Sequence, residues 1–68
     1  MWLKLHAQVT EGKTAPILTN MDNVLHVIPR DDGGAAIFGV DGSMYPVAET
    51  CEQIDKAMMA FANGRKHA

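Results

Sequence analysis

The chain has 68 residues, enough for one domain with one small core, and it carries a formal net charge of −2. A chain of this length buries only about 60% of its unfolded surface on folding, so we expect marginal stability as a monomer. Its 6 basic residues are spread thinly against 8 acidic ones, which argues against a nucleic-acid-binding stripe. A hydrophobic content of 47% excludes a disordered chain.

The expected location follows from the cysteine count and from the apolar runs. Cys51 is the only cysteine, so no disulfide can form within the chain, and a lone thiol suits a reducing compartment. No apolar run approaches the ~20 residues that span a bilayer, and the first residues lack the order of a signal peptide. We therefore expect a cytoplasmic protein with no membrane insertion.

Short alternating segments fill the first 47 residues. Residues 2–9 alternate with a period of two, which is typical of a strand, and place Trp2, Lys4 and His6 on one face. Runs rich in β-branched and aromatic residues predict four more short strands, each bounded by turn-forming residues. These strands are expected at residues 16–19, 24–28, 35–40 and 44–47.

Glycine-containing segments predict the connections between these strands. Gly12 and the Arg30–Gly34 segment mark two turns. Asp41-Gly42 is the strongest turn signal, and the pair predicts a type I′ hairpin turn. Pro46 lacks a main-chain N–H, so the strand that contains it is expected to lie at an edge or to end there.

The last part of the chain predicts one amphipathic helix over residues 50–63. Thr50 and Gln53 have the spacing of a capping box, in which each side chain binds the main-chain N–H of the other residue. Asn63-Gly64 predicts the end of the helix, and residues 65–68 are expected to form a frayed tail. One apolar stripe runs along the helix through Cys51, Ile54, Met58 and Phe61.

Together these elements predict an α+β domain over residues 1–64, a small bent antiparallel sheet of four to five strands with one C-terminal helix. One helix covers only one face of such a sheet, whereas several strands are apolar on both faces. Either the sheet curls into a small barrel or its second face meets another chain. The expected core is Leu3, Leu5, Ile17, Val24, Ile28, Ile37, Phe38, Val47, Ile54, Met58 and Phe61.

No group of residues has the spacing of a catalytic or metal site. His6, His26 and Cys51 could converge on a metal only through the fold, and burial in the core explains Cys51 more simply. The aspartates stand beside glycines in turns, where their side chains support the turn backbone. We therefore assign no catalytic residue, cofactor or metal.

Three segments together resemble a known family. They are the opening Trp2–Leu5, the run Pro16–Pro29, and the run Val40–Met58. They resemble the small FlbD/SwrD-like proteins of bacterial flagellar operons over roughly residues 2–60, and small phage or mobile-element proteins share the same plan. The chain departs from the flagellar pattern at Pro46, in the Arg30–Gly34 loop and in its helix rich in alanine and methionine. The resemblance implies a partner-binding accessory protein and no catalytic residues.

These observations predict a non-enzymatic protein-interaction module that forms a homo-oligomer or binds an unknown protein partner. The first alternative is a small nucleic-acid-binding β-domain that uses Trp2, Lys4 and His6. The second alternative is an enzyme subunit that completes a shared active site with His26 or Tyr45. The candidate interaction surface comprises Trp2, Lys4, His6, His26 and Tyr45.

Overall fold

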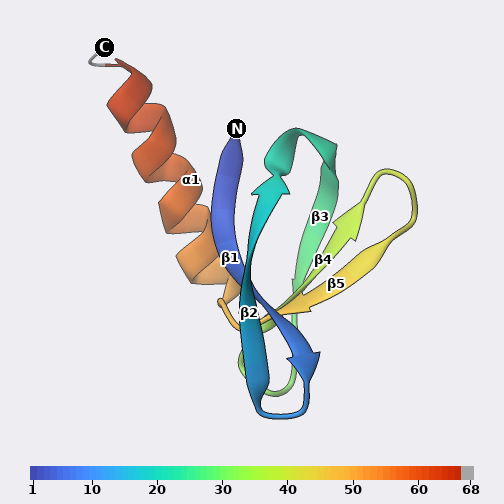
Figure 1. Cartoon of the computed structure of the whole chain (residues 1–68). Helices are drawn as coiled ribbons and strands as arrows, with labels where there is room; N and C mark the ends of the chain where they lie inside the picture. Colours follow the sequence, from blue (N-terminus) through green and yellow to red (C-terminus); the bar gives the residue numbers. More distant parts are fainter. Residues whose placement is uncertain (67–68) are drawn as a thin grey trace.

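The computed structural model describes residues 1–66 and contains five strands, a short 3₁₀ helix and one α-helix (Figure 1). Two strands and the 3₁₀ helix come first, three more strands follow, and the α-helix comes last. Their bounds are β1 Trp2–Thr10, β2 Lys13–Asn20, η1 Met21–Asn23, β3 Val24–Pro29, β4 Ala35–Gly39, β5 Met44–Val47 and α1 Cys51–Lys66.

The strands form one antiparallel sheet in the order β2-β1-β5-β4-β3. The predicted α+β fold with one C-terminal helix is therefore confirmed, with five strands. The sheet does not close into a barrel, because β2 and β3 remain its two edges. Of the two arrangements expected for the apolar strands, the closed barrel is thus excluded.

Prolines stand on both edges, where their missing N–H groups cost no hydrogen bond within the sheet. The Met21 N–H donates to the Met1 carbonyl at 2.8 Å, so Met1 and Met21 form a hydrogen-bonded pair. Because hydrogen-bonded and non-hydrogen-bonded pairs alternate along an antiparallel ladder, Pro16 falls in a non-hydrogen-bonded pair and its nitrogen faces away from β1. The Arg30 N–H donates to the Gly34 carbonyl at 2.9 Å, which in the same way turns Pro29 away from β4. A proline on an edge strand discourages another strand from pairing there.

Pro46 lies inside the sheet and limits the contact between β5 and β1. Ala7 and Val47 form the one register pair between these strands, and beside it the Ala48 N–H donates to the His6 carbonyl at 2.8 Å. Alternation would next pair Gln8 with Pro46, which has no N–H to donate. We call Ala7, Val47 and the flanking His6–Ala48 hydrogen bond the β1–β5 junction. β5 was expected to lie at an edge or to end at Pro46; it lies in the centre of the sheet and ends one residue later, at Val47.

Two hairpin loops share one geometry, and the predicted type I′ turn at Asp41-Gly42 is wrong. No residue other than glycine has a positive φ in the described part of the chain, whereas type I′ needs a positive φ at both central residues. The Gly39 N–H instead donates to the Ser43 carbonyl at 2.9 Å, and Gly42 takes the left-handed position with φ of 87°. This is a type I turn followed by a glycine bulge.

The loop between β3 and β4 repeats the arrangement. The Gly33 N–H donates to the Arg30 carbonyl at 3.2 Å, and Gly33 has φ of 95°. In each loop an aspartate Oδ1 accepts an N–H two residues ahead at 3.0 Å, from Gly34 to Asp32 and from Ser43 to Asp41. An Asp-Gly pair therefore specifies both loops through the aspartate acceptor and the glycine conformation.

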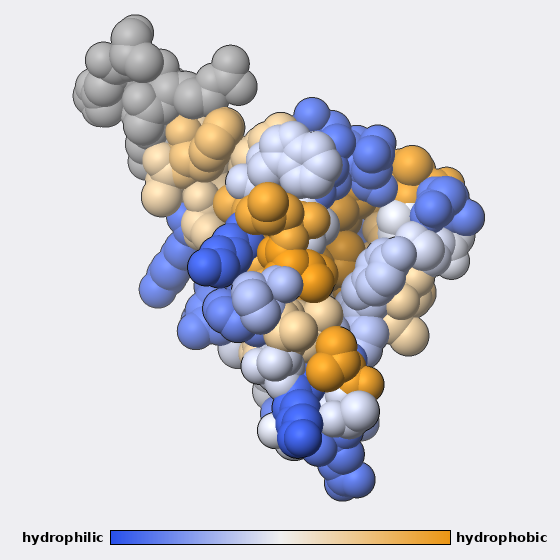
Figure 2. Space-filling view, in the orientation of Figure 1, coloured by the Kyte–Doolittle hydropathy of each residue, from blue (hydrophilic) through white to orange (hydrophobic). Residues whose placement is uncertain are grey.

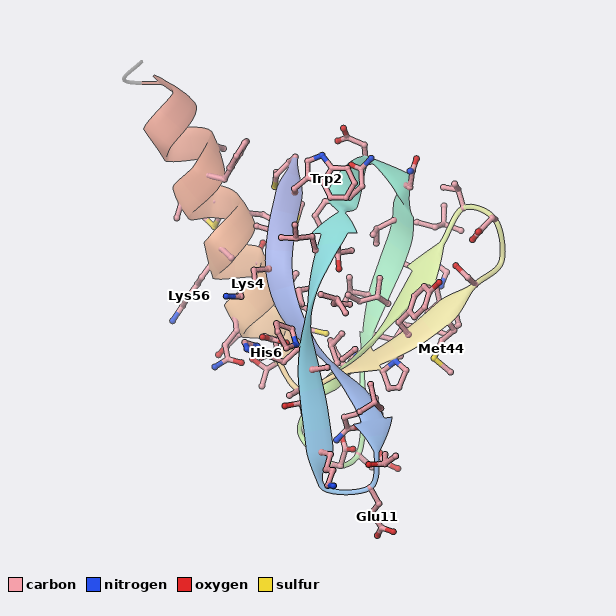
Figure 3. The ribbon with its side chains drawn as sticks, viewed as in Figure 1. Trp2, Lys4, His6, Glu11, Met44 and Lys56 are labelled. Atoms are coloured by element: carbon pink, nitrogen blue, oxygen red, sulfur yellow. The ribbon has the colours of Figure 1, made fainter. Side chains whose placement is uncertain are left out.

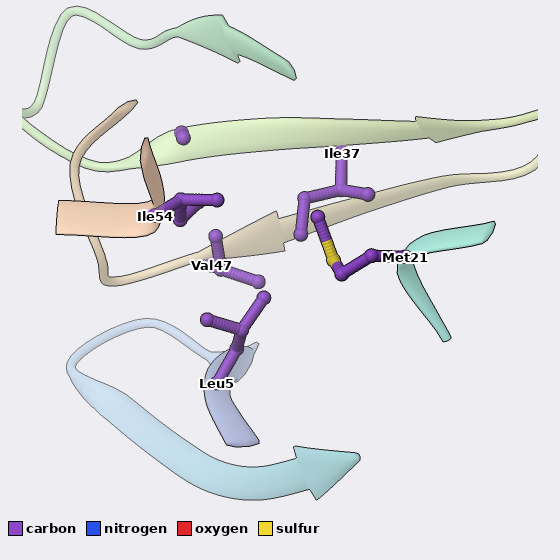
Figure 4. Packing of buried hydrophobic residues seen from close by; sticks show 6 residues of the cluster. Leu5, Met21, Ile37, Val47 and Ile54 are labelled. Carbon is purple, nitrogen blue, oxygen red and sulfur yellow. The ribbon is translucent and has the colours of Figure 1, made fainter. Parts of the chain in front are cut away.

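The core lies between the inner face of the sheet and the first turns of α1 (Figure 4). The strands β1, β4 and β5 contribute to it, while η1 supplies Met21 and α1 supplies Ile54. Of the predicted core residues, Leu5, Ile37, Val47 and Ile54 are buried. Leu3, Ile17, Val24 and Met58 are partly buried against them, and sequence reasoning missed Met21 and Ala35.

Three predicted core residues lie outside the core. Phe38 is partly buried on the other face of the sheet, opposite Met44. Ile28 is 45% exposed, because the register of β3 shifts between Val24 and His26. Such a bulge moves the alternation by one residue, so Val24 and Val27 pack against the core and Ile28 does not. Phe61 is 37% exposed and belongs to the part of α1 that extends beyond the strands (Figure 1).

The start of α1 matches its sequence signature, and its end does not. Thr50 Oγ1 accepts the Gln53 N–H at 3.1 Å, and Gln53 Oε1 accepts the Thr50 N–H at 2.9 Å, so the capping box is confirmed. The helix continues to Lys66, through the stop predicted at Asn63-Gly64. A glycine inside a helix costs only about 1 kcal/mol, which a helical context tolerates. Residues 67–68 of the predicted tail lie outside the described residues.

Replacement of Ile54 tests how α1 is held on the sheet. Ile54 is 2% exposed, and Ile54→Ala is expected to lower the free energy of unfolding by about 2–5 kcal/mol, since it leaves a cavity. Denaturant unfolding followed by circular dichroism measures the loss. Ile54→Val, with an expected loss of about 0.5–1.5 kcal/mol, keeps the test readable if the alanine variant does not fold. Equal losses in Ile54→Ala and in Met59→Ala, at an exposed position, would contradict this packing.

Replacement of Thr19 tests a change that is expected to stabilise the fold. Its Oγ1 is buried and is the one such side-chain atom without a hydrogen-bond partner among the described residues. A buried hydroxyl without a partner costs about 1–3 kcal/mol. Thr19→Val is therefore expected to raise the melting temperature, whereas Thr14→Val, on the exposed part of the same strand, should not. A melting temperature lowered by Thr19→Val would show that the hydroxyl is satisfied in solution.

Candidate interaction surface

The β1–β5 junction opens an apolar groove on the inner side of the sheet. Beyond the junction, the β1–β2 hairpin and the β4–β5 hairpin diverge (Figure 1). The space between them is an open groove of about 810 Å³. Ile17, Val24 and Ile37 line this groove and also belong to the core or pack against it. The groove is therefore a side of the core that the chain itself leaves uncovered.

The lining of the groove is mainly apolar. Figure 2 shows apolar side chains gathered in the hollow between β2 and the β4–β5 hairpin, with hydrophilic residues around them. Tyr45 stands opposite Ile37 in the β4–β5 register, so both side chains lie on the inner face. Tyr45 is 54% exposed while Ile37 is 2% exposed, because the groove opens above Tyr45. Among the described residues that line the groove, Asp41 is the only charged one.

Three of the predicted surface residues lie along the outer face of β1. Trp2, Lys4 and His6 follow one another on alternate positions, as Figure 3 shows. Leu18 of β2 stands opposite Lys4 and is 70% exposed, which widens this face. The predicted grouping of these three residues on one strand face therefore agrees with their place in β1.

His6 is bound at the end of this row by a carboxylate. Glu49 Oε1 accepts the His6 main-chain N–H at 2.9 Å, and Glu49 Oε2 lies 2.6 Å from His6 Nδ1. Partial burial acts to raise the pKa of Glu49, but the hydrogen bonds from the His6 ring and N–H outweigh it and lower the pKa. Glu49 thus ties β1 to the start of α1 and places negative charge beside His6.

Tyr45 lies on the inner face, away from the other three residues, and His26 shares their outer face but stands on β3, which β5 and β4 separate from β1. His26 stands opposite Phe38 in the β3–β4 register, and the two ring centroids are 4.9 Å apart. Phe38 is paired in turn with Met44 on β5, next to Tyr45 in sequence, so His26 and Tyr45 lie on opposite faces of the sheet. The five predicted residues therefore form no single surface within one chain.

The described residues hold no cluster that fits a metal ion. No three histidine, cysteine, aspartate or glutamate side chains gather as ligands in residues 1–66. His6 contacts Glu49, His26 contacts Phe38, and Cys51 packs against the core. At the rim of the groove, the Ser43 hydroxyl and N–H both donate to Asp41 and lower the pKa of its carboxyl group.

Sequence reasoning missed a second apolar feature, the middle of α1. Residues 57–62 are apolar without interruption, so this part of the helix has no polar face. Ala57 and Met58 are partly buried, and the next four residues are exposed. The side chain of Met59 is 57% exposed. The signal was present in the sequence, but a search for one amphipathic stripe passes over a helix segment that is apolar all round.

Comparison with protein-family models, with curated proteins and with solved structures gave no match. No helix in the described part of the chain is both long enough and apolar enough to cross a membrane.

The contact between His6 and Glu49 makes stability depend on pH. Folding lowers the pKa of Glu49 below its ordinary value of 4.5, so the ionised carboxylate stabilises the fold. This stabilisation is lost as the pH falls from that ordinary value through the lower pKa of the folded state. The difference in unfolding free energy between the wild type and Glu49→Gln should therefore be largest near neutral pH and shrink in acid. Glu52→Gln, on the exposed first turn of α1, is the control. A difference that stays constant over the whole pH range would contradict the contact.

Proposed function

We propose that this chain is a small non-enzymatic protein-interaction module that acts as an oligomer. One observation carries the proposal: the inner face of the sheet opens into an apolar groove that continues into the core. Contiguous exposed apolar surface of this kind is typical of a protein–protein interface. The resemblance to the FlbD/SwrD-like proteins of flagellar operons supports the same class of function, an accessory protein that works by binding a partner.

The distribution of large apolar side chains supports the proposal further. Ten such residues are exposed in the described part of the chain, and they lie at the groove, on the outer faces of the β1–β2 hairpin and of β5, on β3 and on α1. Isolated exposed apolar residues need no explanation, but those beside the groove extend one continuous surface. The exposed large apolar residues that line the groove are Val9, Leu18, Val40 and Tyr45.

The sheet edges are less suited to this role than the faces. An added strand needs main-chain donors along the edge, and Pro16 and Pro29 each remove one donor from the outward side. The bulge between Val24 and His26 also interrupts the β3 edge. Association through the groove and the helix is therefore favoured over extension of the sheet.

The nucleic-acid alternative has less support. It depends on Trp2, Lys4 and His6, and Lys4 is the only lysine or arginine among them. The Glu49 carboxylate lies against His6 and opposes a negatively charged ligand there. No second basic residue lies on this strand.

Solution mass tests the proposal. Sedimentation equilibrium and light scattering, from low micromolar to near-millimolar concentration, should give a mass that rises to a multiple of the 7.4 kDa chain. A constant mass of one chain would contradict an oligomer. A parallel titration with mixed oligonucleotides at low salt examines the alternative, since binding that weakens steeply with added salt would favour it instead.

A further inference from the structure

The loop between β3 and β4 makes a side-chain contact that crosses the sheet. Arg30 directly follows β3, an edge strand, and β4 and β5 lie between β3 and β1. Arg30 Nη1 nevertheless donates to Gln8 Oε1 on β1 at 2.5 Å, and the loop lies next to β1 in Figure 1. The loop therefore connects the β1–β2 hairpin to the far side of the sheet.

The Arg30 side chain is held in this position by its own loop. Arg30 Nη2 lies 2.7 Å from Asp32 Oδ2, so the guanidinium binds Gln8 and Asp32 at the same time. The other carboxylate oxygen of Asp32 accepts the Gly34 N–H at 3.0 Å. Gly34 is buried against β5, where a Cβ would overlap the Val47 carbonyl oxygen. We call Arg30, Asp32 and Gly34, together with the contact to Gln8, the strap.

The strap reaches β1 at the point where the two halves of the sheet separate. Gln8 follows Ala7 of the β1–β5 junction, and Gln8 also lines the groove. Pro46, on the opposite strand, has no N–H to donate there. On the other side of the junction, Glu49 binds His6. A side-chain contact therefore stands on each side of the single register pair, and the strap is the one on the groove side.

We propose that the strap is a conformational device that controls how far the groove opens. The β1–β2 hairpin meets β5 at one register pair, so the junction can act as a hinge between this hairpin and the other strands. Release of Gln8 by Arg30 frees the β1–β2 hairpin to move relative to the β4–β5 hairpin, and the two hairpins are the walls of the groove. The inference goes beyond the proposed function and does not depend on it, because the opening of the groove is a property of the single chain.

Amide hydrogen exchange tests the strap at the junction itself. The Ala48 N–H donates to the His6 carbonyl across the junction. The Gly39 N–H donates to the Ser43 carbonyl within the β4–β5 hairpin. Arg30→Met removes the guanidinium and keeps an unbranched side chain. It is expected to speed exchange of the Ala48 N–H about tenfold or more and to leave exchange of the Gly39 N–H unchanged.

Two further variants separate this contact from a general loss of stability. Gln8→Met removes the acceptor of the same hydrogen bond, so the double variant Q8M/R30M should exchange at Ala48 no faster than Arg30→Met alone. Lys56→Met removes one positive charge from an exposed position on α1 and should leave the exchange unchanged.

Folding and mass are verified for every variant. Circular dichroism verifies the fold, and light scattering verifies that the variants and the wild type are compared at the same mass. If Arg30→Met does not fold, Arg30→Lys keeps the charge without the planar, two-sided contact. It should give a smaller rise in the same direction.

Spin labels on the two hairpins measure the opening of the groove. Glu11 lies at the exposed turn of the β1–β2 hairpin and Met44 begins β5, and Figure 3 shows the two residues apart. Glu11→Cys and Met44→Cys, in a chain with Cys51→Ala, provide the labelling sites. Electron spin resonance should give a broader distribution of label–label distances when Arg30→Met is added, and the same distribution when Lys56→Met is added.

The other outcomes overturn the inference. If Arg30→Met speeds exchange at Ala48 and Gly39 by the same factor, Arg30 contributes only to overall stability. A double variant whose effect is the product of the two single effects would show that Arg30 and Gln8 do not act through one contact. Unchanged exchange at Ala48, or an unchanged distance distribution, overturns the strap as a restraint on the hinge. None of these results decides the proposed function, which the solution mass tests separately.

Discussion

The structure depends on one narrow connection, the β1–β5 junction. A single register pair, Ala7 with Val47, joins the β1–β2 hairpin to the three remaining strands. Pro46 cannot donate to Gln8, so the two halves separate immediately beyond that pair. On the other side of the pair, Ala48 and Glu49 together bind the carbonyl and the N–H of His6. The sheet is thus firmly held at one end of the contact and open at the other, and the opening is the groove.

The same few residues also fix where the helix begins. Val47 is fully buried at the junction, Glu49 binds His6, and Thr50 caps α1. The helix therefore leaves the sheet at a set position, with Ile54 directed into the core and the later turns of α1 extending beyond the strands (Figures 1 and 4). One short stretch of sequence therefore has two effects. It places α1 over one side of the core, and it leaves the core exposed on the side of the groove. This links the stability of the fold to the surface proposed for binding.

Local sequence signals predicted local structure well and spatial relationships poorly. The strands of alternating residues and the capping box of Thr50 and Gln53 depend on neighbours in the chain, and each is present. The bulge at Val24–His26 arises from pairing with β4, so alternation within β3 alone could not show that Ile28 faces outward. The turn at Asp41-Gly42 was assigned from a residue pair that suits more than one loop length. Among the candidate surface residues, Trp2, Lys4 and His6 share a strand, whereas the position of Tyr45 in the groove depends on the bend of the whole sheet.

The separation in sequence between the two sides of the junction bears on the order of folding. Each hairpin and the capped start of the helix involve residues close together in the chain, and such contacts form with a small loss of chain entropy. The junction instead joins two residues that are far apart in the chain, Ala7 and Val47, and closing so long a loop is slow. We therefore expect the β1–β2 hairpin and the β3–β4–β5 unit to form as two local folding units whose docking completes the domain. We expect amide protons of the core to exchange with solvent through opening of the junction.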